Sequence, residues 1–148
     1  MQRAAHSMIG LAGLAMVFSA AHAQTLPPNI AGLWNFEAQL PDVCDFDGTA
    51  RLTPTEDPAE FGCELTARQY CPELNVTYVV EQTCTASIIE EGVIVQSTIV
   101  NFIEGEPSVN YRPDNFILTI TDPSTMTGKL FGSEEFPAEW RRANGAIS

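Results

Sequence analysis

Histidine is the most informative absence in this chain. The two histidines, His6 and His22, lie near the amino terminus, and none follows residue 22. Imidazole is the side chain whose unperturbed pKa falls between pH 5 and 8, and it is the usual general base in enzymes. A domain formed by the later residues therefore cannot contain a Ser-His-Asp triad or a Cys-His dyad. We predict a protein without enzymatic activity and without catalytic residues.

Long hydrophobic runs are also scarce. The one extended apolar stretch, "MIGLAGLAMVFSA" (8–20), is too short to span a bilayer comfortably. Arg3 precedes it and the small residues of "AHA" (21–23) follow it, which is the pattern of a secretory signal peptide. We expect residues 1–23 to be a signal peptide, and residues 24–148 to form a single domain that is periplasmic or secreted. A membrane anchor is the alternative interpretation of the same run.

Positive charge is rare as well. After residue 23, six Lys and Arg residues stand against all nineteen Asp and Glu residues, which leaves a net charge of −13. The six cations are Arg51, Arg68, Arg112, Lys129, Arg141 and Arg142. Such an excess of negative charge repels phosphate backbones and anionic lipid surfaces, so we expect no nucleic-acid partner and no stable membrane insertion. The acidity serves either solubility or attraction to a basic partner.

Four cysteines remain, and an even number in a small exported chain predicts two disulfides. The residues are Cys44, Cys63, Cys71 and Cys84, and three pairings are open. Sequence does not decide among them, although the sequential set, Cys44–Cys63 and Cys71–Cys84, would tie neighbouring segments together. Without a CxxC pair or a histidine, a zinc site is not expected.

An acidic stretch, "PDVCDFDGTA" (41–50), offers the oxygen ligands that calcium requires. Its carboxylates, Asp42, Asp45 and Asp47, do not match the EF-hand spacing. The stretch instead favours an Asp-Gly turn after Cys44. We therefore predict no metal and no cofactor.

Helical periodicity is missing too, because no window of a dozen residues shows it. The best candidate, "PTEDPAEF" (54–61), is interrupted by two prolines and predicts a loop or a single turn. Alternation with a period of two dominates instead. Between residues 30 and 40 the even positions are small or apolar, whereas the odd positions include Asn35, Glu37 and Gln39. This pattern predicts a strand with one dry face and one wet face.

Similar alternation continues along the chain. The clearest hairpin joins 85–90 to 93–102 through Glu91-Gly92, where we expect glycine to supply the positive backbone angle of the turn. Further strands are expected in 75–84, 115–121, 126–131 and 137–142, with a turn at Asp122-Pro123-Ser124. Roughly eight short strands predict an all-β fold, an antiparallel up-and-down meander barrel. A two-sheet β-sandwich is the alternative.

Gly32-Leu33-Trp34, at the start of the first expected strand, resembles the Gly-x-Trp signature of the calycins, the superfamily of lipocalins, fatty-acid-binding proteins and avidins. In that superfamily the tryptophan closes one end of a meander barrel and a late arginine lies across its ring. The resemblance implies a barrel-closing role for Gly32, Trp34 and either Arg141 or Arg142. The second lipocalin signature is absent, and two tryptophans after the signal are too few for an avidin-like biotin site.

Two functions fit these features. The first is a binding module whose barrel encloses a small apolar or amphipathic ligand. Its expected lining is Trp34, Phe36, Tyr78, Val80, Phe116 and Leu118, although the same residues would also make an ordinary core. The second is an interaction protein of the cell envelope or extracellular space, such as a barrel-type protease inhibitor, which would use loops on a solidly packed barrel. The state of the barrel interior distinguishes the two.

Overall fold

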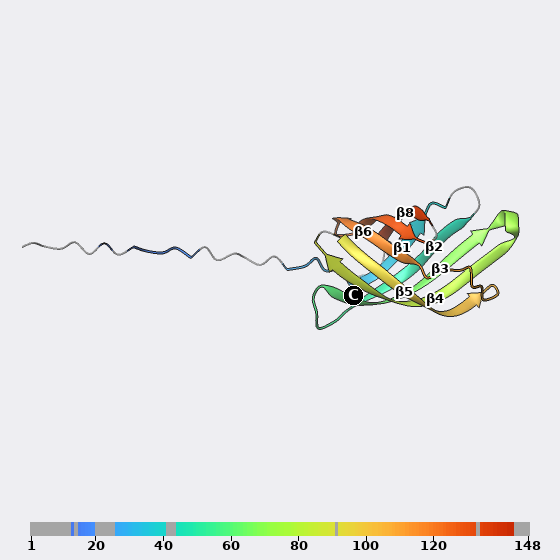
Figure 1. Cartoon of the computed structure of the whole chain (residues 1–148), viewed down its shortest axis with the longest axis horizontal. Coiled ribbons are helices and arrows are strands. Elements are labelled where there is room, and N and C mark those ends of the chain that lie inside the picture. Colours follow the sequence, from blue (N-terminus) through green and yellow to red (C-terminus); the bar gives the residue numbers. More distant parts are fainter. Residues whose placement is uncertain are drawn as a thin grey trace, which may run out of the picture.

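The computed structural model describes residues 13, 15–19, 26–40, 44–90, 92–132 and 134–143. Eight antiparallel strands follow one another in chain order, and the last pairs with the first to close a barrel (Figure 1). The strands are β1 Gly32–Ala38, β2 Asp45–Pro54, β3 Glu60–Cys71, β4 Val76–Ile89, β5 Gly92–Glu104, β6 Asn115–Asp122, β7 Thr125–Phe131 and β8 Glu135–Arg142. A single 3₁₀ turn, η1 Pro72–Leu74, joins β3 to β4. The predicted meander barrel is confirmed, and the β-sandwich alternative is wrong because the ladder between β1 and β8 closes the sheet on itself.

The predicted signal peptide and its cleavage site fall almost wholly outside the described residues, of which only 13 and 15–19 belong to it. The boundary at residue 23 therefore stays a prediction. Asp42 and Glu91 also lie outside the described residues. Within the ranges given above, no helix is long and apolar enough to cross a membrane.

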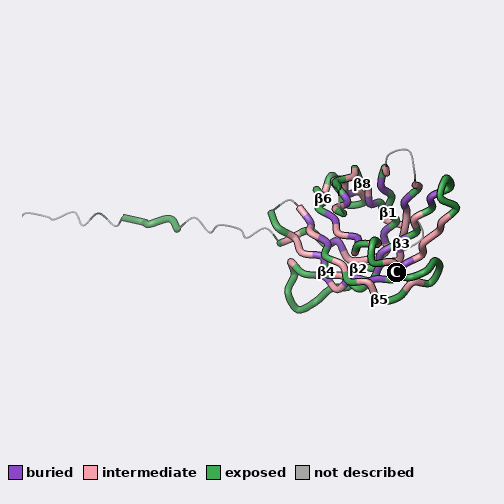
Figure 2. The backbone as a smooth tube through the Cα atoms, turned by 45° about the vertical axis from the view of Figure 1, so that its right-hand side comes forward, coloured by how far each residue is buried: buried purple, intermediate pink, exposed green. Residues whose placement is uncertain are grey.

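The alternation read from the sequence places one face of each strand inside the barrel. In β1, Trp34, Phe36 and Ala38 are buried, whereas Asn35 and Glu37 between them are exposed. Figure 2 shows buried positions recurring along the strands among exposed and half-buried ones. The same period of two in the other strands produces one continuous interior.

Aromatic rings fill the centre of that interior. The Phe36 ring lies 5.2 Å from the Trp140 ring and 5.3 Å from the Phe116 ring, measured between centroids. Phe116 and Trp140 are themselves 5.1 Å apart in an edge-to-face arrangement. Gly48 of β2 faces this cluster, and a Cβ atom there would lie 2.3 Å from Cζ of Phe36. Glycine at this position thus leaves room for the ring.

The structure corrects two turn predictions. Asp47 and Gly48 do not form an Asp-Gly turn, because both lie inside β2, where Gly48 pairs with Phe36. In the β4–β5 hairpin the residue with a positive φ is Glu90, at 56°, and not Gly92, which begins β5. The hairpin itself and the turn between Asp122 and Thr125 are confirmed.

Two disulfides join neighbouring strands, but not in the sequential pairing. Cys44 bonds to Cys71 and Cys63 bonds to Cys84. Strand register explains the outcome, because Cys63 lies directly opposite Cys84 in the β3–β4 ladder, whereas its β2 neighbour is Leu52. The Cα atoms are 4.1 Å apart in the first bridge and 4.5 Å apart in the second. Two such bonds indicate an oxidising environment.

Candidate functional site

The floor of the barrel, the end at which β1 begins and β8 ends, is closed by Trp34 and Arg142. Trp34 is 1% exposed and donates its indole N–H to the Ile30 carbonyl at 2.9 Å. The guanidinium carbon of Arg142 lies 4.5 Å from the centroid of the Trp34 ring, within the range of a cation–π contact. Arg141, the other arginine considered for this place, is exposed and pairs with Glu139.

Hydrogen bonds hold the Arg142 guanidinium over the indole. It donates to the carbonyl oxygens of Asn29 at 2.8 Å, Ala31 at 2.6 Å and Pro123 at 2.7 Å. Gly32 lies beside it with φ of 127°, and a Cβ atom at that residue would be 3.0 Å from Nη1 of Arg142. Glycine therefore supplies both the backbone conformation and the space. The contacts join the segment before β1, the β6–β7 turn and the end of β8, so the floor is sealed.

The six side chains expected to line a ligand site divide unequally between packed core and cavity. Trp34, Phe36, Val80, Phe116 and Leu118 are each at most 3% exposed. Trp34, Phe36, Phe116 and Leu118 belong to the packed core, and Val80 is fully buried. Only Tyr78 lines the cavity described next. The floor half of the barrel is thus filled by the protein's own side chains.

A cavity of ≈ 390 Å³ lies at the mouth, the opposite end of the barrel, where β1 ends and β2 begins. Ligand pockets in proteins typically measure about 300–1,000 Å³, so this one suits a small molecule. Its apolar wall includes Leu40, Phe46, Tyr78, Tyr111, Leu130 and Phe136, and its polar groups include Gln69 and Asp114. Phe46 also touches the packed cluster, with its ring 5.9 Å from that of Phe36. The cavity therefore begins where the aromatic packing ends.

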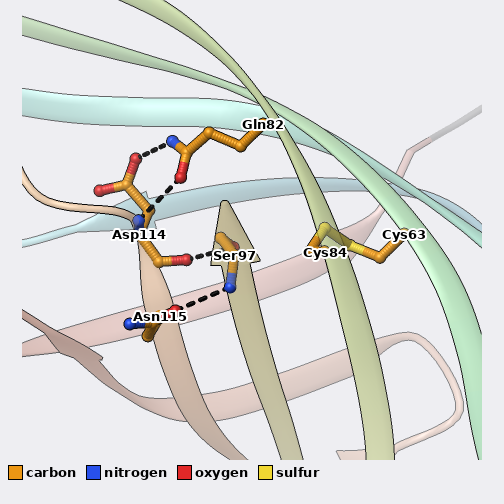
Figure 3. The surroundings of a disulfide bond; sticks show 6 residues. All are labelled: Cys63, Gln82, Cys84, Ser97, Asp114 and Asn115. Carbon is orange, nitrogen blue, oxygen red and sulfur yellow. Dashed lines mark hydrogen bonds between the residues drawn. A yellow bond between two sulfur atoms is a disulfide. The ribbon is translucent and has the colours of Figure 1, made fainter. Parts of the chain in front are cut away.

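The segment between β5 and β6 covers one side of the mouth. Backbone pairing of these strands reaches only Val95 and Phe116. Beyond that point the Ser97 hydroxyl donates to the Asp114 carbonyl at 2.6 Å, and the Ser97 N–H donates to the Asn115 side chain at 2.8 Å (Figure 3). Side-chain hydrogen bonds thus continue the connection where the ladder stops.

Asp114 is the buried charge of the cavity wall, with 6% of its surface exposed. Gln82 of β4 donates from Nε2 to Asp114 Oδ2 at 2.5 Å and accepts the Asp114 N–H at 2.8 Å (Figure 3). The Tyr111 hydroxyl donates to the same Oδ2 at 2.9 Å. Gln82 is itself 2% exposed, so its paired bonds to Asp114 satisfy both ends of a buried amide.

Burial dominates the ionisation of this cluster. It raises the pKa of Asp114 from 3.8 to about 6, while the hydrogen bonds from Gln82 and Tyr111 oppose the shift. Burial, and then the nearby Asp114 carboxylate, raise the pKa of Tyr111. Tyr111 therefore keeps its proton and remains a donor. At neutral pH Asp114 is mostly ionised inside a largely apolar wall.

A larger hollow, of ≈ 620 Å³, lies on the outer surface. Outward-facing polar and charged side chains line much of it, among them Asn35, Glu37, Asp47 and Arg141. Phe36 is the one aromatic residue among its described lining residues. The mouth cavity, whose wall has several aromatic and aliphatic side chains, is the better candidate for a ligand. Across the described parts of the chain, no group of three or more His, Cys, Asp or Glu residues is arranged to hold a metal ion.

Sequence reasoning did not identify Gln82, Asp114 or Tyr111 as site residues. Gln82 occupies an inward position of a strand, between the buried residues Val80 and Ala86 in the alternating pattern. A polar residue at such a position needs a partner, and this was the available signal. Asp114 and Tyr111 lie in a segment without periodicity, so their burial could not be read from the sequence.

Comparison with known proteins shows the fold. No protein-family model matches the chain, and no curated protein matches it. Among solved structures, the chain is similar to a β-barrel described as a de novo designed, fluorescence-activating protein. The TM-score is 0.51 and the identity 16%, over 77% of this chain and 94% of the designed one.

Proposed function

We propose that this protein is an exported, non-enzymatic binding protein whose barrel holds one small apolar or amphipathic ligand at its mouth. The observation that carries the proposal is the ≈ 390 Å³ cavity with an apolar, aromatic wall and a few convergent polar groups. Concave sites of this composition are the usual form of small-molecule sites. The sealed floor leaves the mouth as the entrance.

The construction of the barrel supports a calycin-like assignment within this proposal. Gly32, Trp34 and Arg142 come together at the floor as the resemblance implies for that superfamily. The designed barrel, described as fluorescence-activating, has a similar fold and supports the idea that such a barrel suits a binding role.

Export and the lack of enzymatic activity form part of the same proposal. Two disulfides and the signal-like first 23 residues favour a periplasmic or extracellular location. The domain after residue 23 contains no histidine, so the ordinary base of neutral-pH hydrolysis is missing. Steady turnover of an ester or glycoside panel by the purified protein would overturn this part.

Native mass spectrometry of the full chain, incubated with fatty acids, retinoids and small aromatic compounds, tests ligand binding. A blocking variant then tests the location. Gly132 lines the cavity, and a Cβ atom there would meet nothing closer than the Glu134 carbonyl at 4.0 Å. Gly132→Trp is therefore expected to fold and to reduce the population of the bound species at least tenfold.

The matched control is Gly62→Trp, on the outer face of β3, where a Cβ atom would be 3.8 Å from the nearest atom. This variant should bind as the unmodified chain does. Absence of any added mass across the panel contradicts the proposal. Equal binding by the two tryptophan variants contradicts the assignment of the site.

A second candidate function is interaction with a protein partner near the mouth. Leu74 in η1, Ile103 at the end of β5 and Val109 in the β5–β6 segment are 67%, 55% and 99% exposed. All three lie at the same end of the barrel, and exposed apolar side chains there favour a contact surface. Cross-linking and affinity capture from the native compartment should recover a stoichiometric partner, and replacing all three with Ser should abolish capture. Capture that survives this triple substitution contradicts the assignment.

A further inference from the structure

One oxygen of the Asp114 carboxylate is left without a protein partner. Both hydrogen bonds to this carboxylate, from Gln82 and Tyr111, end on Oδ2. Among the described residues no donor reaches Oδ1, and Figure 3 shows this oxygen apart from the bonded one. Asp114 lines the mouth cavity. Oδ1 is thus an accessible acceptor on an otherwise buried side chain, and it is left for a group that enters the cavity.

The charge of Asp114 is likewise uncompensated. The ion pairs in the described part of the chain are Arg68–Asp47, Lys129–Glu135 and Arg141–Glu139, and all three lie on the exposed outer surface. A carboxylate that is 6% exposed and has no cation beside it is costly, since it has lost most of its hydration without gaining a counter-charge. A cationic group in the cavity would supply the missing partner.

Aromatic rings share the cavity wall with this carboxylate, and Tyr111 contacts it directly. Tyr78 and Tyr111 both line the cavity, with ring centroids 5.5 Å apart. Phe102 completes the group, with its ring 5.7 Å from Tyr111 and 6.2 Å from Tyr78. The faces of aromatic rings attract organic cations, and aromatic rings around a carboxylate are suited to ammonium groups.

The other charged groups on the cavity wall are Arg112 and Glu134, which are both exposed and opposite in sign. Solvent screens exposed charges, so their combined effect on a ligand is small. The net charge of the chain, −12, adds a long-range attraction for cations. The nearby Asp114 carboxylate and the net negative charge of the chain thus both favour a cationic ligand.

We propose that the mouth cavity binds a small organic amine in its protonated form, with the ammonium group at Asp114 Oδ1 and an apolar body among the aromatic and aliphatic side chains. This inference rests on the proposed binding function and specifies the ligand class. Asp114 supplies the counter-charge, while Tyr78 and Tyr111 supply π faces. Gln82 and the Tyr111 hydroxyl hold the carboxylate in place through Oδ2.

The test compares three probes of similar shape and different charge: 2-phenylethylamine, 2-phenylethanol and 3-phenylpropionate. Titration calorimetry with the full chain at pH 7.5 should give the tightest binding for the amine, at least tenfold tighter than the alcohol, and the weakest for the acid. Asp114→Asn should remove the preference for the amine over the alcohol. Glu56→Gln, an exposed carboxylate in the β2–β3 connection with the same change in charge, should leave that preference unchanged.

A second measurement needs no variant. Asp114 becomes protonated near pH 6, whereas the amine remains charged, so amine affinity should fall about tenfold between pH 7.5 and pH 5. The affinity of the alcohol should stay constant. Binding of the alcohol without preference for the amine would overturn the inference and leave the binding function intact. If none of the three probes binds, and no member of the broader panel binds either, both the inference and the proposed binding function are overturned.

Discussion

At the scale of single residues, the two buried indoles of the barrel differ in their hydrogen bonding. Trp34 is 1% exposed and donates its N–H to the Ile30 carbonyl. Trp140 is 0% exposed, and its N–H has no partner among the described residues. An unsatisfied buried donor lowers stability by its desolvation cost, so removing it is favourable, whereas breaking a satisfied pair leaves the acceptor without its bond.

The matched substitutions Trp34→Phe and Trp140→Phe separate these contributions, because each removes a similar volume. We expect Trp34→Phe to lower the free energy of unfolding by about 1–3 kcal/mol more than Trp140→Phe, since it also loses the hydrogen bond and weakens the contact with Arg142. Urea unfolding monitored by circular dichroism measures both values. Equal losses would show that the Trp34 hydrogen bond and cation contact add little.

Asp114 gives the molecule a defined pH dependence. A carboxyl whose pKa is 3.8 unfolded and about 6 folded binds more protons in the folded state across that window. Its contribution to the free energy of unfolding is therefore fully present below about pH 4 and falls by about 3 kcal/mol as the pH rises past 6. Asp114→Asn cannot ionise, so this loss should disappear.

Urea titrations of the two proteins at pH 4 and pH 7.5 measure this effect. The variant should gain stability relative to the unmodified chain on going to pH 7.5, by up to the amount stated above. The other carboxylates are common to both proteins and cancel in the comparison. A difference between the two proteins that is the same at both pH values would contradict a buried, ionising Asp114.

At the scale of elements, alternation placed β1 and β4 to β8, but it placed neither β2 nor β3, and it did not give the strand register. Segments 75–84 and 85–90 were expected as two strands and form one, β4, whose pairing with β5 shifts near Val79 and Glu81. β2 was obscured because Asp47-Gly48 has turn chemistry, while its inward glycine makes room for Phe36. Taken alone, the Asp-Gly dipeptide favours a turn. Packing against a ring from another strand outweighs this preference and places the dipeptide within a strand.

The two disulfides close loops of similar length, with sequence separations of 27 and 21 residues. Loop-closure entropy predicts that removing either one costs about 3 kcal/mol, with a difference well below 1 kcal/mol. Their positions differ, however, because Cys44 lines the mouth cavity and the pair Cys63–Cys84 does not.

Replacing Cys44 and Cys71 with Ser should therefore weaken ligand binding at least threefold as well as stability. Replacing Cys63 and Cys84 with Ser should lower stability by a similar amount and leave affinity nearly unchanged. Unfolding and calorimetric titration of both double variants give the comparison. If the second pair affected affinity more than the first, the site would lie deeper in the barrel than the mouth cavity.

At the scale of the whole molecule, the barrel is packed at its floor and hollow at its mouth. The sequence predicted the closed meander, whereas the roles of Gly32 and Trp34 at one end came from the resemblance to the calycins, which left Arg141 and Arg142 as alternatives. Of the lining predicted for a ligand site, only Tyr78 lies in the cavity, whose wall combines residues far apart in the sequence, such as Leu40 and Phe136. Such residues become neighbours only when the last strand pairs with the first and closes the barrel. Alternation alone does not reveal which strands pair.

The position of a bound ligand tests this division of the interior most directly. Isotope-filtered nuclear Overhauser measurements on the full chain with 2-phenylethylamine report which side chains lie against the probe. We expect contacts with the methyl groups of Leu40 and Leu130 and with the rings of Tyr78 and Tyr111. Contacts instead with the methyl groups of Val93, Val95 or Leu118, in the packed interior, would contradict the account.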